Sequence, residues 1–244
     1  MKSLGIDIGG SALKGAPVDR RTGRLLAERF RIPTPEPLSP ARMARAVGEM
    51  VAHFRWHGPV GLGFPGVVQG SRIRSAANLH AGFIGCDGGK LFSQPAGRLV
   101  GLINDAAAAG IAEMKFGAGR GFAGKTLLLT LGTGVGSALA YQGVVVPMEL
   151  GHLEWKGRAA EKRVAASVRE EKDLSWAEWG GRLDEYIAKL EEILWPELII
   201  IGGGVSAKFD KFSRFVKPRA RLVPARLRNH AGIVGAALAA DLHA

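Results

Sequence analysis

The segment that decides the fold covers residues 3–15 and reads SLGIDIGGSALKG. Two apolar runs, at 3–8 and 13–18, are separated by a glycine turn, which is typical of antiparallel strands joined by a tight connection. A third run at 25–32 follows a second turn. The sequence therefore predicts a three-stranded antiparallel meander at the start of a sheet.

The first turn of this meander carries residues suited to phosphate. Asp7 ends the first strand, the turn Gly9-Gly10-Ser11 follows, and Lys14 lies on the second strand. Uncovered backbone N–H groups, a hydroxyl and an amine are the components of a phosphate cradle, beside which Asp7 would orient Mg²⁺ or its water. An ordinary hairpin with glycines at positive φ explains the same residues equally well.

Helix and strand signals alternate along the rest of the chain. Ser39 and Pro40 supply the N-cap and first-turn residues of the first helix. The elements expected to complete the first unit are a helix over 40–54, strands at 59–64 and 99–103, and a helix over 106–116. The order βββαβα then begins again with strands at 126–131, 135–141 and 143–146, a helix over 176–194, a strand at 198–201, and a helix opened by Gly202, Gly203 and Gly204.

This recurrence predicts an internal duplication, although only the glycine turn is visibly shared, DIGGSALKG against LGTGVGSAL. We expect two α/β domains that flank a cleft, where ligands bind at domain interfaces. The N-terminal domain is expected over residues 1–104 and a larger C-terminal domain over 105–229. A C-terminal helix at about 230–244 is expected to pack back on the first domain.

Composition narrows the class of protein. The chain has 244 residues, of which 47% are apolar and 23% charged, and no apolar run approaches the roughly 18 residues of a membrane helix. A membrane-spanning or disordered chain is therefore excluded. Cys86 is the only cysteine, so no internal disulfide and no zinc are expected. A single cysteine and the lack of a signal-peptide pattern favour the cytoplasm.

Charge points to a negatively charged partner. Lysines and arginines number 33 against 22 acidic residues, for a formal net charge of +11. Such a protein attracts polyanions, and nucleic acid, anionic lipid and polyphosphate all remain open on this ground. Many of the basic residues fall within 208–228, where a solvated basic surface is the simpler interpretation.

Two further glycine turns resemble nucleotide-binding segments. The turn containing Gly132, Thr133, Gly134 and Gly136 leads into a strand, whereas a dinucleotide fingerprint opens a helix, so that function is excluded. It remains compatible with phosphate. The run Gly202–Gly204 follows a buried strand and suits phosphates or the base of a nucleotide, and a tight strand-to-helix turn is an equally good explanation.

Candidate chemistry lies in two short segments. Asn104-Asp105 ends one strand and begins a helix, so Asp105 is either an N-cap or a base that accepts the proton of an attacking hydroxyl. Glu149 and His152 are three residues apart and suit hydrogen bonding to adjacent sugar hydroxyls. No third ligand accompanies them at a recognisable spacing, which argues against a metal site. Asn78 is either a further hydroxyl contact or a turn former.

Seven segments, in order, resemble the ROK family of sugar kinases within the actin-like ATPase superfamily: DIGGSALKG, GFPGVV, NDAAAAGIAEM, LTLGTGVGSAL, ELGHLE, IIIGGGVS and AGIVGAALAA. The flanking segments GAPVD, RIPTP, AEKR, DLSW and PARLRNHAGIVGAALA look like the polyphosphate glucokinase branch. The resemblance runs from about residue 3 to residue 240.

The resemblance implies two actin-like (ribonuclease H-like) domains and phosphoryl transfer to the 6-hydroxyl of glucose, with Mg²⁺, from inorganic polyphosphate and often also ATP. It makes Asp105 the catalytic base, and Asn78, Asn104, Glu149 and His152 the sugar contacts. The residues implied to bind the phosphoryl donor are Asp7, Gly9, Gly10, Ser11, Lys14, Gly132, Thr133, Gly134, Gly136, Gly202, Gly203 and Gly204. The resemblance also implies a homodimer and an enzyme that can use mannose as a second sugar. It implies no binding to nucleic acid or membranes.

The sequence departs from the family pattern at three places. The zinc loop CxCGxxGC that follows ExGH in most members is absent, so the sugar carboxylate of that loop has no clear counterpart, with Glu154 and Glu161 as candidates. Val-Pro-Met precedes Glu149 where Asn-Thr is expected. No helix-turn-helix segment precedes Asp7, unlike the family's repressors. A strictly ATP-dependent hexokinase and a non-catalytic polyanion-binding protein remain the alternatives.

Overall fold

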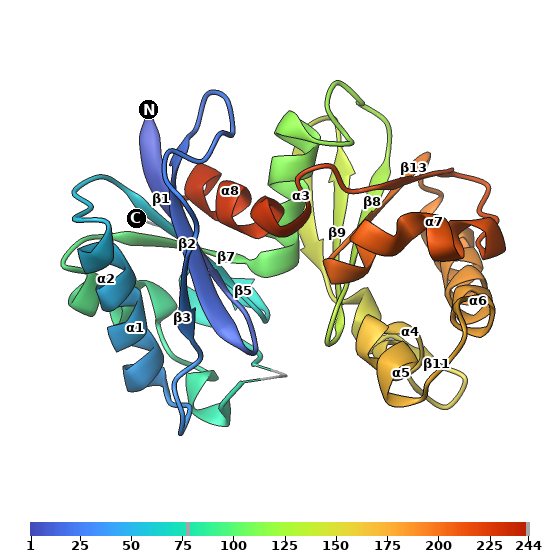
Figure 1. The fold of residues 1–244 in the computed structure, drawn as a ribbon, viewed down its shortest axis with the longest axis horizontal. Helices are drawn as coiled ribbons and strands as arrows, with labels where there is room; N and C mark the ends of the chain where they lie inside the picture. Colours follow the sequence, from blue (N-terminus) through green and yellow to red (C-terminus); the bar gives the residue numbers. More distant parts are fainter. Residues whose placement is uncertain (77–78, 243–244) are drawn as a thin grey trace. The chain divides into compact units, whose positions relative to one another are not determined.

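The computed structural model describes residues 1–76 and 79–242. The chain divides into two compact α/β units, Met1–Ala112 with His230–Ala244, and Glu113–Asn229. Each unit contains one five-stranded mixed sheet (Figure 1). Among the described residues, no helix combines the length and the apolar character needed to cross a membrane.

The first sheet has the order β3-β2-β1-β4-β7. β1, β2 and β3 form the antiparallel meander, and β1, β4 and β7 are parallel. The carboxyl ends of the three parallel strands therefore meet at one edge of the sheet. The bounds are β1 (Lys2–Ile8), β2 (Ala12–Asp19), β3 (Phe30–Pro33), β4 (Val60–Phe64) and β7 (Val100–Asn104).

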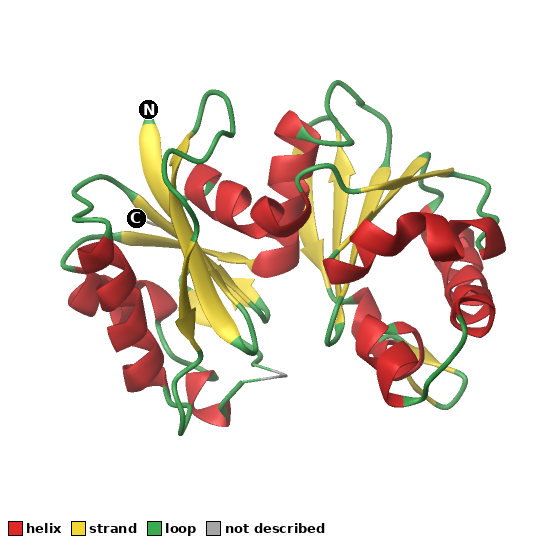
Figure 2. Ribbon diagram, viewed as in Figure 1, coloured by secondary structure: helices red, strands yellow, loops and turns green. Residues whose placement is uncertain are grey.

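Helices cover both faces of this sheet (Figure 2). α1 (Pro40–His53) and α2 (Gly88–Ala96) lie on one face, where their apolar side chains join the core residues of the strands. α8 (Ala231–Leu238) lies on the other face, and α3 (Asp105–Phe116) contacts α8 near its own beginning. Ser39 caps α1 by accepting a hydrogen bond from the N–H of Arg42, as the sequence predicts.

Glycine allows α8 to lie directly on the strands. Gly5, Gly61 and Gly101 are register partners on β1, β4 and β7, so they form one row across the sheet. A Cβ atom on each of them would collide with the backbone carbonyl groups of Ile233, Ala236 and Ala239 respectively. The row of glycines is therefore the surface against which the C-terminal helix packs. Arg20 also fixes the end of the chain through an ion pair with Asp241 (2.7 Å).

The sequence prediction was wrong in detail in the first unit. The third strand covers only Phe30–Pro33 instead of 25–32, because residues 26–29 are exposed and only Leu25 forms an isolated bridge, to Val18. Between β4 and β7 the structure also contains four elements that were not predicted. These are β5 (Val68–Gln69), β6 (Arg72–Ile73), η1 (Ala81–Phe83) and α2. The first unit is therefore more elaborate than βββαβα.

The second sheet has the order β10-β9-β8-β13-β14. β8, β9 and β10 form an antiparallel meander, and β8, β13 and β14 are parallel, as in the first unit. The repeated strand arrangement agrees with the predicted duplication. The bounds are β8 (Thr126–Leu131), β9 (Val135–Tyr141), β10 (Val144–Met148), β13 (Leu198–Gly202) and β14 (Arg221–Pro224).

α6 (Trp176–Leu194) is the long helix that the sequence predicts, and it begins with a capping box between Ser175 and Glu178. Its buried stripe, including Trp179, packs in the core of the second unit. The helix expected after Gly202–Gly204 is instead the 3₁₀ helix η3 (Gly204–Lys208) followed by short segments. The shorter elements are η2 (Leu150–His152), β11 (Glu154–Trp155), β12 (Arg158–Ala159), α4 (Glu161–Val164), α5 (Ala166–Glu171), α7 (Phe209–Phe212), η4 (Ser213–Phe215) and η5 (Arg228–His230).

The boundary between the compact units lies after Ala112, whereas the sequence places it after residue 104. The difference is the first part of α3. Gly235 of α8 approaches the backbone of Ala108 so closely that a Cβ atom would not fit between them. This contact joins the first two turns of α3 to the first unit.

Candidate functional site

The first glycine turn is open. The N–H of Gly9 donates to the carbonyl of Ala12 (2.9 Å), and the hydroxyl of Thr34 donates to the carbonyl of Gly9 (3.1 Å). A Cβ atom on Gly10 would meet nothing within 4 Å. Neither Gly9 nor Gly10 has a positive φ, so the hairpin of β1 and β2 forms without the left-handed glycines that the simpler explanation required. Gly10 leaves its part of the turn uncovered, and the exposed Ser11 completes the turn.

Asp7 lies beside this turn at the carboxyl end of β1, with Lys14 as its register partner on β2. Burial raises the pKa of the Asp7 carboxyl, while the positive charges of Lys14 and Arg29 oppose the rise. Gly232 makes room for the carboxyl group, and Gly63 lies beside it at ordinary contact distance. A Cβ atom on Gly232 would lie 2.8 Å from its Cγ, and one on Gly63 would lie 3.6 Å from its Oδ1.

The raised pKa of Asp7 predicts a stability penalty at neutral pH. Folding favours the protonated carboxyl, so the native state loses stability as the pH rises from the usual aspartate range through the raised pKa. We expect Asp7→Asn to raise the free energy of unfolding at pH 7, and this gain should disappear in acid. Urea denaturation of both proteins between pH 4 and about pH 8 measures the difference. A variant that is less stable than the wild type at pH 7 would contradict the assigned cause.

Asn104 and Asp105 form the junction between β7 and α3. The Asn104 amide donates to the carbonyl of Gly66 (3.1 Å) and accepts from the N–H of Ala107 (2.9 Å), so Asn104 supplies the helix cap. Asp105 is the first residue of α3, and its Oδ1 accepts from the N–H of Ala106 (2.7 Å). The cap role that the sequence left open for Asp105 therefore falls mainly to Asn104.

Asp7 and Asp105 both lie next to Gly63 at the carboxyl edge of the first sheet. Gly63, on the strand between theirs, is the register partner of Asp7. A Cβ atom on Gly63 would lie 3.6 Å from Oδ1 of Asp7 and 3.7 Å from the Cα of Asp105. The structure thus brings together the aspartate expected beside the phosphates and the aspartate expected to act as a base.

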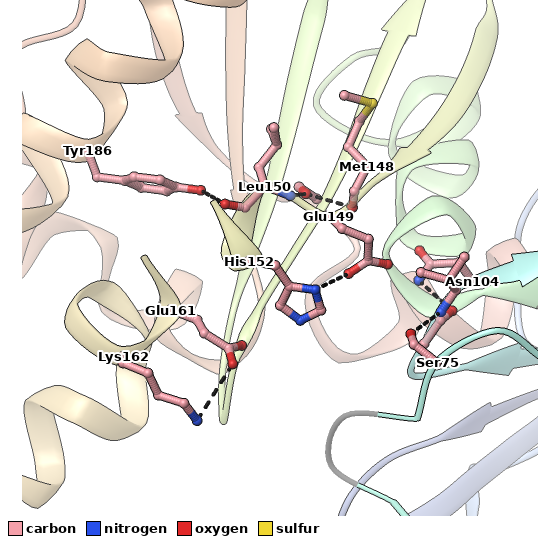
Figure 3. A network of polar contacts seen from close by, with 12 residues as sticks. Ser75, Asn104, Met148, Glu149, Leu150, His152, Glu161, Lys162 and Tyr186 are labelled. Carbon is pink, nitrogen blue, oxygen red and sulfur yellow. Dashed lines mark hydrogen bonds and ion pairs between the residues drawn. The ribbon is translucent and has the colours of Figure 1, made fainter. Parts of the chain in front are cut away.

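Glu149 and His152 face one another, with 3.7 Å between Oε2 and Nδ1 (Figure 3). Burial raises the pKa of Glu149, the His152 ring opposes this, and the Glu161 carboxylate adds to it. The segment is held in place from both sides. The hydroxyl of Ser137 donates to the carbonyl of Met148 (2.8 Å), and that of Tyr186 donates to the carbonyl of Leu150 (2.8 Å).

Gly151, between the two, packs against the backbone carbonyl of Val135, and a Cβ atom would not fit there. The glycine of this motif is thus required by backbone contact rather than by space between the carboxylate and the imidazole. Of the two further candidates for a sugar carboxylate, Glu154 is exposed, and Glu161 forms an ion pair with Lys162 (3.6 Å).

The second glycine turn lines a cavity of about 320 Å³ in the second unit. The N–H of Gly132 donates to the carbonyl of Gly134 (3.0 Å), and Ser167 donates through its N–H to Gly132 (3.1 Å) and through its hydroxyl to Thr133 (2.9 Å). Gly136 is the register partner of Thr130 at the start of β9. Backbone groups of this turn therefore lie at the wall of a cavity large enough for a small ligand.

The third glycine run divides between two roles. Gly203 has φ +78°, and a Cβ atom there would collide with the backbone of Leu131, so this residue makes the tight turn. Gly202 ends β13, whereas Gly204 lines the 320 Å³ cavity. The tight-turn explanation therefore applies to Gly203, and the binding role predicted for this run stays a prediction.

Several residues at these sites were missed from the sequence. Trp176 lines the 320 Å³ cavity between Arg169, whose Cζ lies 4.2 Å from a Trp176 ring centroid, and Lys208, whose Nζ lies 5.9 Å away. From the sequence, Trp176 was placed as the first residue of the helix expected over 176–194. Nothing in the sequence indicated that Arg29 and Gly63 lie near Asp7, because only the folded sheet brings them close to its carboxyl group.

Asn78 lies outside the described residues. Among those that the structure describes, no three His, Cys, Asp or Glu side chains gather as a metal site would require. Mg²⁺ is usually held by one or two carboxylates together with waters and substrate phosphates. The partly buried Asp7 carboxyl beside an open phosphate-compatible turn fits this mode of binding.

A family model described as "ROK family" matches residues 3–163, which is well over half of the chain. The chain belongs to the ROK family. Over 97% of its length it is 43% identical to a polyphosphate glucokinase from Mycobacterium tuberculosis, 90% of which is covered. It is 27% identical to a glucokinase from Streptomyces coelicolor, with 96% of each chain covered.

Solved structures of ROK proteins have the same fold. An inorganic polyphosphate/ATP-glucomannokinase from Arthrobacter sp. strain KM superposes with a TM-score of 0.95 at 45% identity, covering 100% of this chain and 99% of that one. A ROK glucokinase from Streptomyces griseus, in complex with glucose and AMPPNP, gives a TM-score of 0.83 at 22% identity, with 97% and 98% covered. The fold is thus that of the actin-like sugar kinases, as expected.

Proposed function

We propose that this ROK protein transfers a phosphoryl group from inorganic polyphosphate to the 6-hydroxyl of glucose, which yields glucose 6-phosphate. The observation that carries the proposal is the likeness, along nearly the whole chain, to enzymes named polyphosphate glucokinase and polyphosphate/ATP-glucomannokinase. The net charge of +11 suits a polyanionic donor. ATP as a second donor is supported by the 320 Å³ cavity, because Trp176 and the second glycine turn both line it.

In the proposed reaction, the oxygen of the glucose 6-hydroxyl attacks the terminal phosphorus of the donor. The proton passes to the Asp105 carboxylate, and the bond to the bridging oxygen breaks, so the donor leaves one phosphate shorter with the bonding electron pair. Kinase catalysis depends mainly on positioning and on charge stabilisation. The hydrogen bond from the N–H of Ala106 orients the Asp105 carboxylate.

The remaining proposed roles concern binding. Asn78, Asn104, Glu149 and His152 contact the sugar, and the paired carboxylate and imidazole of the last two provide both acceptor and donor groups. Backbone N–H groups of the Gly9–Ser11 turn, the Lys14 amine and the Gly132–Gly136 turn hold phosphate. Gly204 takes part at the wall of the 320 Å³ cavity.

Kinases of this kind generally require a divalent metal, and we propose Mg²⁺, with Asp7 as the residue that holds it through water. When bound, Mg²⁺ neutralises charge on the transferred phosphoryl group. We also propose that mannose is a second acceptor, because the Arthrobacter relative is named a glucomannokinase. A homodimer is proposed from the family resemblance, and a cytoplasmic location from the single cysteine.

The donor is tested by measuring glucose 6-phosphate formation with long-chain polyphosphate or ATP at equal phosphoryl concentration and at two salt concentrations. We expect polyphosphate to support turnover, and high salt to lower that rate more than the rate with ATP, because screening weakens the attraction of a long polyanion. Turnover with ATP alone would favour the ATP-dependent hexokinase. No turnover with either donor would favour a polyanion-binding protein.

A further inference from the structure

A second hollow of the second unit lies along the edge strand β14 and has a volume of about 470 Å³. We call it the β14 groove. Arg221, Val223 and Pro224 of the strand line it, together with Ala225 directly after the strand. Ser206 and Ala207 of η3 line it as well, whereas Gly204 and Lys208 of η3 line the 320 Å³ cavity. The two hollows therefore lie on either side of η3.

The β14 groove is positively charged along its length. Arg221 stands at the start of β14, and Arg226 and Arg228 stand just beyond its end, against the single carboxylate of Asp210. All three arginines are exposed, and within residues 113–229 none of their guanidinium groups is in a salt bridge. At a strand rise of about 3.3 Å per residue, β14 alone separates the backbone of Arg221 from that of Pro224 by roughly 10 Å, and Arg226 and Arg228 follow beyond that end. That separation suits an extended anion better than a single phosphate.

The loop that carries two of these arginines is fixed by a buried carboxylate. Glu113, with no exposed surface, accepts hydrogen bonds from the N–H groups of Ala118 (2.7 Å), Arg226 (3.1 Å) and Leu227 (2.7 Å). Ala118 is itself part of the groove wall. Arg228 has φ +49°, in the left-handed region that L residues seldom adopt. The backbone that presents the arginines is thus held rigid before any ligand binds.

We propose that the β14 groove binds the phosphate chain of inorganic polyphosphate beyond the unit that is transferred. This inference rests on the proposed function. It names the residues that would bind the part of a long donor that is not transferred. Guanidinium groups recognise phosphate through paired hydrogen bonds, and pre-ordering them reduces the entropy lost on binding. The groove does not suit nucleic acid, because its one aromatic residue, Phe209, packs edge-on against Phe212.

The test compares two triple variants that remove the same positive charge. Arg221→Gln/Arg226→Gln/Arg228→Gln empties the groove of arginine. Lys211→Gln/Arg214→Gln/Lys217→Gln changes three exposed residues of the same basic segment that do not line the groove. For each protein we would measure KM and kcat with long-chain polyphosphate, tripolyphosphate and ATP, and the affinity for long-chain polyphosphate by calorimetry without glucose.

We expect the groove variant to raise KM and Kd for long-chain polyphosphate by about tenfold or more, and the control variant by much less. Both should retain the wild-type KM for ATP and for tripolyphosphate, which also shows that they are folded. Equal losses in the two variants would overturn the inference and leave the proposed function standing. If the wild type uses only ATP but the groove variant alone loses polyphosphate binding, the proposed function fails and the groove assignment stands.

Discussion

Asp105→Asn is expected to lower kcat by about two to four orders of magnitude while KM for glucose changes little. The amide cannot accept the proton of the attacking hydroxyl, but it keeps an oxygen that accepts the hydrogen bond from the N–H of Ala106. The start of α3 should remain intact, because Asn104 provides the cap through Ala107. Steady-state kinetics with either donor, together with glucose binding by calorimetry, measures both effects.

The matched control for this prediction is Asp87→Asn. Asp87 also stands at the beginning of a helix, where its carboxylate accepts the N–H of Lys90 (3.1 Å), and asparagine caps equally well. We expect the control to retain wild-type kcat. Near-normal turnover of Asp105→Asn would show that Asp105 is not the catalytic base. Loss of glucose binding would show that its role is structural instead.

Gly61→Ala is expected to cost about 3 kcal/mol of stability or more, beyond the usual range for one extra methyl group in a core. A Cβ atom at position 61 would collide with the carbonyl of Ala236 on α8, and backbone on both sides leaves no side chain that can move away. The helix would have to lift from the row of glycines. Urea denaturation gives the change in the free energy of unfolding.

The same substitution at Gly181 is the control for Gly61. Gly181 lies within α6, and a Cβ atom there would meet nothing within 4 Å. Gly181→Ala should therefore stabilise the protein by up to about 1 kcal/mol, because alanine favours the helix. If Gly61→Ala were as stable as the wild type, close contact between α8 and β4 could not be the reason for glycine at that position.

Much of the fold could be predicted from local patterns. Short apolar runs separated by glycine turns indicated the two meanders. Apolar residues at helical spacing indicated α1 and α6, and Ser39 marked the start of α1. α2 was missed because a pair of glycines opens it and Pro95 lies inside it, and both residues disfavour helix. The strands β5 and β6 have two residues each, too few for any periodicity to appear.

The candidate site could be predicted only where its residues are close in sequence. Asp7 and Lys14 belong to one hairpin, and Glu149 and His152 to one turn, so spacing was informative. The contact of Glu113 with the N–H groups of Arg226 and Leu227 joins residues more than 100 positions apart, and nothing local indicates it.

The proposed function is tested most directly by ³¹P NMR of a nucleotide-free reaction that contains the purified protein, glucose, Mg²⁺ and long-chain polyphosphate. The account predicts that a glucose 6-phosphate resonance grows as polyphosphate is consumed, with one phosphate lost from the chain for each sugar phosphate formed. It also predicts that Asp105→Asn slows this growth by about two to four orders of magnitude. A spectrum in which polyphosphate persists and no sugar phosphate forms, from protein that phosphorylates glucose with ATP, would contradict the account.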